Sequence, residues 1–340
     1  MDLKIEDSTR LARCLLRGDA YFGSALAAMQ GPPERHSFFL PTAVKVCERH
    51  EGPIRILEIG SWAGASSITW VKAFLELGRS ITIDCVDNWA PYFDLNRELH
   101  ESYIQMNEAA ATGDIYKLFL HNIHAEKIET HVSIYRGDSQ EILPKLNAES
   151  YHLIYIDASH LYSDVRSDIR EAKRLILDGG IICGDDLEIQ ANQLSPQELL
   201  QAVEAGLDYT SAGEAGSFHP GVTAAVSEEL GPVSSWKGYW AVGWDAGKTV
   251  QIALDLSMAK LPVHVQHAIN EEPQFQVELV FEGSTHNIAK AGAGYIAVSK
   301  ALGVVELLHE RIGERDLGDF VLLGHDLDDL KRRIAALSQS

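Results

Sequence analysis

The sequence has few cysteines, no long apolar run and no basic cluster, and each absence excludes a class of protein. The 340 residues include four cysteines, and none of them forms a C-x-x-C pair, so neither a zinc site nor a disulfide framework is indicated. No stretch approaches the roughly 18 apolar residues of a membrane span. The charged first residues lack the apolar core of a secretory signal. We therefore expect a cytoplasmic protein with no membrane partner.

Acidic residues outnumber basic ones, 49 to 29, and the formal net charge is −20. Such a surface repels DNA, RNA and anionic membranes, because all of them carry negative charge. No run of lysine and arginine is long enough to form a local basic patch. Nucleic acid is therefore not expected as a partner, and the sequence leaves the formation of a homo-oligomer open.

Apolar segments alternate with segments of helical period between residues 52 and 245, which predicts an α/β fold with a doubly wound, mostly parallel, Rossmann-like sheet. The predicted strands are 54–60, 80–87, 131–138, 151–157, 179–186 and 237–245. The predicted helices between and around them are 65–78, 139–146, 163–176, 195–206 and 220–231.

Changes in composition divide the chain into three predicted parts. Residues 1–51 read as an N-terminal helical segment, and 52–245 as the sheet domain, with a polar helical insert at 96–128. After a linker at 246–262, residues 263–340 combine short strands, Gly-rich turns and a terminal helix. We interpret them as a small α+β module, which serves interaction, oligomerisation or simply the covering of a sheet edge.

A glycine-containing loop, "LEIGSWAGASS", follows the first predicted strand. Gly60 and Gly64 allow a tight turn and a close approach of the backbone to a ligand. The spacing is not G-x-G-x-x-G, because Ala63 and Ala65 interrupt it, so a pyrophosphate-binding loop is disfavoured. Glu58 at the strand end would repel a phosphate and suits a cationic ligand.

Polar residues also follow the second and third predicted strands. Asp87 ends the second strand, where an acid typically accepts hydrogen bonds from a ribose. Asp138 and Ser139 follow the third strand and are placed to reach the edge of a base. Taken singly, such residues are often turns or helix caps. Their occurrence at successive strand ends is harder to explain in that way.

Three carboxylates and an imidazole follow the fourth and fifth predicted strands. Asp157 ends the fourth strand, and Asp185 with Asp186 ends the fifth. Close carboxylates repel unless they are protonated or neutralised by a cation, and oxygen-rich sites suit Mg²⁺ or Mn²⁺. His160 has a reference pKa of about 6.5, which suits proton removal near neutral pH. The alternatives are that an aspartate caps the next segment and that His160 bonds a backbone carbonyl or contacts the cofactor.

Together these segments resemble class I S-adenosylmethionine-dependent methyltransferases, and the group they resemble most is methyltransferase family 24. That group is related to metal-dependent sugar and macrolide O-methyltransferases and, more distantly, to catechol O-methyltransferases. The segments that carry the resemblance are "LEIGSWAGASS", "DCVDNW", "YRGDSQEILPKL", "IYIDASHLYSDVRSDIREAKRLILDGGIICGDD" and "FHPGVTAAV".

The resemblance implies S-adenosylmethionine as the cofactor and assigns roles to the strand-end residues. Gly60 and Gly64 would flank its methionine part, and Glu58 would orient the surroundings. Asp87 would hold the ribose hydroxyls, and Trp89 would either wall the pocket or pack the loop. The implied cofactor-binding residues are Glu58, Gly60, Ser61, Gly64, Asp87, Trp89, Asp138, Ser139 and Asp157.

The resemblance also implies a catalytic centre. Asp157, Asp185 and Asp186 would bind a divalent cation, Mg²⁺ or Mn²⁺, and His160 with Asp157 would be the catalytic pair, with His160 as general base. The expected reaction is methyl transfer to an oxygen of a small hydroxylated acceptor, sugar-like or a natural product. The alternatives are a metal-independent N-methyltransferase and a non-catalytic cofactor-binding or interaction protein of surface-glycan biosynthesis.

Overall fold

The computed structural model describes residues 10–11, 14–15, 17–29, 31–97, 100–270, 277–291, 294–300 and 321–337. Contacts divide the chain into two compact units, and each is described by itself. The sheet unit comprises Gly31–Leu99 and Ile128–Pro262. The second unit comprises Met1–Gln30, His100–Lys127 and Val263–Ser340. The boundaries predicted from composition stay a prediction.

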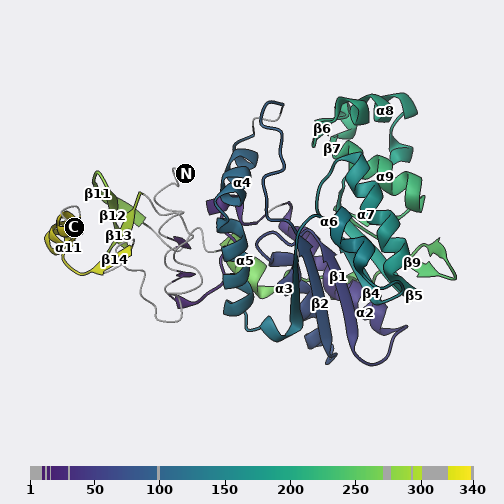
Figure 1. Cartoon of the computed structure of the whole chain (residues 1–340), viewed down its shortest axis with the longest axis horizontal. Coiled ribbons are helices and arrows are strands. Elements are labelled where there is room, and N and C mark those ends of the chain that lie inside the picture. The colour runs from purple at the N-terminus through teal and green to yellow at the C-terminus, as the bar shows by residue number, and fades with distance from the viewer. Residues whose placement is uncertain are drawn as a thin grey trace. The chain divides into compact units, whose positions relative to one another are not determined.

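The sheet unit is built on an eight-stranded sheet in the order β10-β9-β5-β4-β1-β2-β3, with β8 paired to β9 (Figure 1). The strands β1 to β5 are parallel, and β9 runs antiparallel to β5. The predicted doubly wound, mostly parallel sheet is therefore confirmed. The parallel strands are β1 (Ile54–Ile59), β2 (Ile81–Asp87), β3 (Val132–Arg136), β4 (Tyr151–Ile156) and β5 (Ile176–Leu187). The others are β8 (Ser234–Trp236), β9 (Gly238–Asp245) and β10 (Lys248–Val250).

Helices cover both faces of this sheet (Figure 1). The helices α7 (Tyr162–Leu175) and α9 (Pro220–Leu230) pack together on one face, and α2 (Phe39–Cys47) and α3 (Ala65–Glu76) pack together on the other. In α7 the buried side chains recur at the spacing of one helix face, and they include the carboxyl group of Asp168. The sheet unit also contains the helices α6 (Ser139–Ile142) and α8 (Pro196–Ala205).

Each face has its own core. The α7/α9 face buries mainly aliphatic side chains, such as Ile154 and Ile169. The α2/α3 face is aromatic, because Phe39 stacks on Trp70 with ring centroids 4.1 Å apart and meets the edge of Tyr155. Aromatic pairs of this geometry add to the stabilisation from area burial. The two cores hold the strand ends, and therefore the site, in fixed positions.

The sequence predicts that the sheet ends near residue 245, but the sheet continues past that residue. Gly247 adopts a φ of +75° and turns the chain back, so that Lys248–Val250 pair with the end of β9. A small hairpin, β6 (Thr210–Ser211) with β7 (Ser217–Phe218), was also not predicted. These strands have two or three residues, too few to show a period of two in the sequence.

The second unit contains helices and a separate sheet. The helices α4 (Glu101–Ala111) and α5 (Asp114–Ala125) form the predicted insert, followed later by α10 (Val263–Asn270). The antiparallel sheet has the order β11-β12-β13-β14 and is joined by the predicted terminal helix α11 (Leu327–Leu337). Its strands are β11 (Val277–Glu282), β12 (His286–Ala291), β13 (Gly294–Ser299) and β14 (Val321–Gly324). Part of the predicted module, 301–320, lies outside the described residues.

Among the helices that the structure describes, none has the length and apolar character needed to cross a lipid bilayer.

Candidate active site

The predicted site residues lie at the carboxyl ends of the five parallel strands β1 to β5, within the sheet unit. The strand order places β4 and β2 on either side of β1, so the connections that leave the adjacent strands β1 and β4 run in opposite directions. Ligands of open α/β sheets bind at such a switch point, outside the carboxyl ends of the strands. The location of the site therefore follows from the topology.

The glycine loop packs directly on the end of β4. Gly60 has a φ of +87°, and a Cβ built on it would lie 1.9 Å from the carbonyl oxygen of Asp157. No other residue fits there without moving one of the two segments. Gly64 has a φ of +86° and is the residue from which α3 begins. The structure therefore gives both predicted glycines a backbone reason to be glycine.

The carboxylate of Asp87 braces this loop. Its Oδ2 accepts hydrogen bonds from the backbone N–H groups of Ser61 and Trp62, both at 2.9 Å. Its Oδ1 accepts the N–H of Trp89 at 2.6 Å. Burial raises the pKa of Asp87, although these three hydrogen bonds oppose the rise. Asp87 thus shapes the cofactor loop, and its contact with the ribose stays a prediction.

Trp89 is buried and closes the loop from the other side. Its indole Nε1–H donates to the carbonyl of Trp62 at 2.7 Å, and only 1% of its surface is exposed. Both tryptophans have a positive φ. The side chain therefore packs the loop, which was one of its two predicted roles.

Glu58 lies beneath the loop, fully buried. Its Oε2 accepts hydrogen bonds from the hydroxyl of Ser61 at 2.8 Å and from the hydroxyl of Ser67. Burial raises the pKa of Glu58 to about 7, against the effect of the serine hydroxyls. Its Oε1 has no hydrogen-bond partner among the described residues. A cationic ligand would favour the charged form of Glu58, and its binding there stays a prediction.

Asp138 and Ser139 begin helix α6. Asp138 is exposed and accepts the backbone N–H of Gln140 at 2.8 Å, as a helix cap does. The hydroxyl of Ser139 bonds the carboxyl group of Asp168 in α7. The capping alternative therefore describes the position of Asp138, and the predicted contacts of both residues with adenine stay a prediction.

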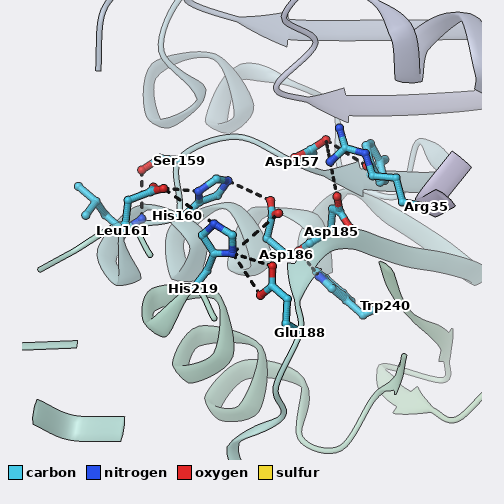
Figure 2. A network of polar contacts seen from close by, with 12 residues as sticks. Arg35, Asp157, Ser159, His160, Leu161, Asp185, Asp186, Glu188, His219 and Trp240 are labelled. Carbon is cyan, nitrogen blue, oxygen red and sulfur yellow. Dashed lines mark hydrogen bonds and ion pairs between the residues drawn. The ribbon is translucent and has the colours of Figure 1, made fainter. Parts of the chain in front are cut away.

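An arginine lies between two of the three predicted metal ligands. Figure 2 shows the guanidinium of Arg35 between the carboxylates of Asp157 and Asp185. Nη1 of Arg35 makes a close ion pair with Oδ2 of Asp185 and lies 3.3 Å from Oδ2 of Asp157. The hydroxyl of Tyr155 donates to the same oxygen of Asp157 at 3.1 Å. The predicted charge compensation therefore exists, but a side chain provides it for this pair.

His160 lies between two other carboxylates. Its Nε2 is 3.0 Å from Oδ2 of Asp186, and its Nδ1 is 2.8 Å from Oδ1 of Asp208. Burial disfavours the charged imidazole, but the two carboxylates outweigh it and hold the pKa of His160 well above its ordinary value. The pKa of Asp186 is lowered, because its attraction to His160 outweighs burial. The two carboxylates therefore favour the protonated form of the ring.

His219, which precedes α9, completes a closed arrangement of acids and imidazoles (Figure 2). Its Nδ1 is 3.0 Å from Oε1 of Glu188 and 3.8 Å from Oδ1 of Asp186. Its Nε2 is 3.8 Å from Oδ2 of Asp208. The rings of His160 and His219 meet edge to face, with centroids 4.4 Å apart. Asp186 and Asp208 therefore each face both imidazoles.

The predicted trio of carboxylates is divided between these two clusters. A register shift in the pairing with β9 lies between Gly184 and Leu187, and Asp186 within it has a φ of +65°. Such a bulge re-aims side chains at a strand end. Asp185 consequently faces Arg35, and Asp186 faces the imidazoles. Among the described residues, three groups have ligand atoms within 4.8 Å of one another and could hold a cation, and the one that includes Asp157 also contains His160 and Asp186. The other two groups combine His219 with His160 and Asp208, or with Asp186 and Glu188.

A cavity of about 450 Å³ opens beside His160 and Asp208. Tyr92 and Phe93 form one wall with their ring centroids 4.0 Å apart, and Leu161 is a further apolar contact. The cavity has the size of a small-molecule site, and its lining combines apolar side chains with polar and charged ones.

Sequence reasoning missed four polar residues of this site. Arg35 comes from a 3₁₀ turn, Pro33–Phe38, that carries no recognisable motif. Asp208 lies in the loop after α8, and Glu188 follows β5 directly. His219 stands inside "FHPGVTAAV", which carried the resemblance, but its side chain drew no attention. Its place immediately before a predicted helix was the one available signal.

The comparisons with known proteins agree with the predicted family. A family model described as a methyltransferase domain, of the family 24 type, matches residues 57–187. No curated protein matches the chain. The matched segment contains the glycine loop, Asp87, Asp157 with His160, and the Asp185–Asp186 pair.

Several solved structures are similar at low identity. An O-methyltransferase family protein from Burkholderia thailandensis shares 12% identity over 62% of this chain and 55% of that chain, with a TM-score of 0.37. TomG is an O-methyltransferase of tomaymycin synthesis from Streptomyces achromogenes that was solved with S-adenosylmethionine. It shares 16% identity over 71% of this chain and 89% of that chain, with a TM-score of 0.36. An O-methyltransferase from Bacillus cereus in complex with S-adenosylhomocysteine shares 16% over 64% and 89%, with a TM-score of 0.33. With TM-scores below 0.5, none of these carries the assignment. The assignment rests on the family model, to which residues 57–187 of this chain are similar as a methyltransferase domain.

Proposed function

We propose that the protein transfers the methyl group of S-adenosylmethionine to a hydroxyl oxygen of a small acceptor, sugar-like or a natural product. One observation carries the proposal. A cavity of about 450 Å³ adjoins His160 and Asp208 at the sheet edge where the glycine loop also ends. The glycine loop, the ionisable groups and the cavity all belong to the sheet unit, which supports their assignment to one site.

The reaction is an in-line displacement at the sulfonium methyl group. The bond from carbon to sulfur breaks as the bond from carbon to the acceptor oxygen forms, and S-adenosylhomocysteine leaves as a neutral thioether. The hydroxyl proton has to leave the oxygen. The fixed loop and cavity supply orientation, and well-oriented reactants gain effective molarities on the order of 10⁵ M or more.

His160 is the proposed acceptor of that proton. Asp208 holds Nδ1 of the ring, which leaves Nε2, the nitrogen that faces Asp186, for proton exchange. The ring has to be neutral to accept a proton, whereas the two carboxylates favour the charged ring. His160 must therefore lose its proton before it can act as a base. The charge around the ring determines how easily that proton is lost.

The proposed divalent cation, Mg²⁺ or Mn²⁺, would be held by Asp157 and Asp186 beside His160. Bound there, a cation lowers the pKa of the acceptor hydroxyl and disfavours the proton on His160. Asp185 was predicted as a third ligand, and its pairing with Arg35 leaves that role a prediction. A metal-independent N-methyltransferase stays the alternative, since Arg35 already compensates part of the acidic charge.

The test combines binding with turnover. Calorimetry with S-adenosylhomocysteine should show one site per chain, and a panel of sugars, phenols and amines should show transfer to hydroxyl compounds. His160→Ala should lower turnover by roughly 10²–10⁴-fold with cofactor affinity retained. If S-adenosylhomocysteine did not bind, the proposal would be refuted. Transfer to amines alone, undiminished by a chelator, would establish the alternative.

A further inference from the structure

The guanidinium of Arg35 occupies the space between the two carboxylates at the ends of β4 and β5. It contacts Oδ2 of Asp185 and lies 3.3 Å from Oδ2 of Asp157. Only 7% of the Arg35 side chain and 1% of the Asp185 side chain are exposed. Removing one member of such a buried pair leaves an uncompensated charge, which is strongly unfavourable. The arginine is therefore part of the site and not a passing surface contact.

The backbone around Arg35 is shaped to admit the guanidinium. Gly31 has a φ of +65°, and a Cβ built on it would lie 2.7 Å from Nη1 of Arg35 and 3.4 Å from Oδ2 of Asp185. A side chain at Gly31 would therefore collide with the ion pair itself. The 3₁₀ turn Pro33–Phe38 and the helix α2 that follows it then fix the direction of approach.

A divalent cation shared by Asp157 and Asp185 would need the same space. The guanidinium already carries a positive charge between the two oxygens, so a metal ion there meets both steric exclusion and repulsion. Asp186 is not involved, since the bulge turns it toward His160. Arg35 thus compensates the charge of Asp157 and Asp185, and His160 faces that of Asp186.

We propose that Arg35 is a built-in cation that takes the place of a divalent metal between Asp157 and Asp185, so that Asp185 does not ligate metal in this protein. Any metal is then confined to the Asp186 side of the cluster. The proposal concerns metal binding alone and stands or falls independently of the acceptor and of methyl transfer.

Mn²⁺ binding to the full-length chain, followed by electron paramagnetic resonance, tests this proposal. Arg35→Met removes the charge and keeps much of the volume. We expect Asp185→Asn to leave the Mn²⁺ affinity of the parent unchanged. Arg35→Met should raise Mn²⁺ affinity by about tenfold or more, because a further carboxylate becomes available as a ligand. Adding Asp185→Asn to Arg35→Met should abolish the gain.

Two results would overturn the proposal. One is a parent protein whose Mn²⁺ binding weakens in Asp185→Asn, since Asp185 would then be a ligand despite Arg35. The other is a folded Arg35→Met variant that gains no affinity. Arg49→Met is the matched control, because Arg49 pairs with Asp245 at 3.2 Å on the surface and its loss should leave Mn²⁺ binding unchanged.

A measurement on the parent protein covers the case in which Arg35→Met does not fold. Crystals of the parent soaked in Mn²⁺ should show no anomalous peak within bonding distance of Asp185. A peak bonded to Asp185 would refute the proposal directly. Where Arg35→Met does fold, Mn²⁺ should also raise its melting temperature more than that of the parent, because a ligand stabilises the state that binds it.

Discussion

His160 and Asp208 lie 48 positions apart in the chain, and yet Nδ1 of the imidazole is 2.8 Å from Oδ1 of the carboxylate. Asp208 comes from the loop between α8 and β6, so this loop fixes the orientation of the proposed base. The loop between α8 and β6 is far from the glycine loop in the sequence. Through Asp208 it would still influence the proposed proton transfer.

Asp208→Ala should therefore lower turnover by about 10²-fold, because His160 loses the group that orients it. Asp208→Asn should lower it less, since the amide oxygen still accepts a hydrogen bond from Nδ1. Affinity for S-adenosylhomocysteine, measured by calorimetry, should stay the same in both. Asp94→Asn, at the edge of the same cavity, is the control. Equal losses in the alanine and asparagine variants would show that orientation is not the role of Asp208.

Asp87→Asn should weaken both the cofactor site and the fold, because one acceptor oxygen becomes an N–H donor that faces the backbone N–H groups of the loop. We expect at least about a tenfold loss of S-adenosylhomocysteine affinity and about 1–3 kcal/mol of stability. Calorimetry and urea unfolding measure the two effects.

Asp84→Asn is the control for this prediction. Asp84 lies in the same strand and accepts hydrogen bonds from Arg55 and Tyr151, both at 2.7 Å, away from the loop. It should lose stability and keep cofactor affinity. Parent-like binding by Asp87→Asn would remove Asp87 from the cofactor site.

Asp168 should make stability fall as pH rises. Burial raises its pKa to about 7 in the folded protein, against the hydrogen bond from Ser139, while the unfolded chain titrates near 4. Between these values the folded state holds the extra proton, so the stabilising contribution is complete below about pH 4 and is lost as pH rises toward about 7. Asp168→Asn should flatten this decline by at most about 4 kcal/mol, measured by urea unfolding at several pH values. An unchanged slope would contradict the assignment.

Two shortened chains test where the sheet unit ends. A chain that ends at Pro262 keeps β10 and the hydrogen bonds of Gln251 and Ile252 to the segment before β9. A chain that ends at Ala246 loses them and exposes the edge of β9. We expect its melting temperature to be lower by about 5 °C or more. Both should bind S-adenosylhomocysteine if residues 263–340 are a separate module, and loss of binding by the longer chain would refute that boundary.

The strands and the glycine loop could be predicted from the sequence, because their signals are local. The run ending at Asp157 is apolar throughout, as a strand buried on both faces must be, and Gly60 follows such a run directly. The family resemblance rested on such local segments, and the family model matches those that lie within residues 57–187.

The partners of those residues could not be predicted, because tertiary packing brings them in. Nothing in the segment around Arg35 indicates that its side chain reaches the ends of β4 and β5. The different directions of Asp185 and Asp186 depend on a bulge in the pairing with β9, a strand more than fifty residues later. Adjacent acids in a sequence show charge and position, and they do not show which neighbour each will meet.

Gly221, at the start of α9, is a position of this site that is unusually sensitive to mutation. A Cβ at this position would lie 2.1 Å from the carbonyl oxygen of His160 and 2.4 Å from the backbone nitrogen of Tyr162. The start of α9 therefore rests on the bare backbone that follows β4. Even a single added methyl group would push His219 away from His160. In evolutionary terms this position is closed to any residue larger than glycine unless the backbone after β4 moves as well.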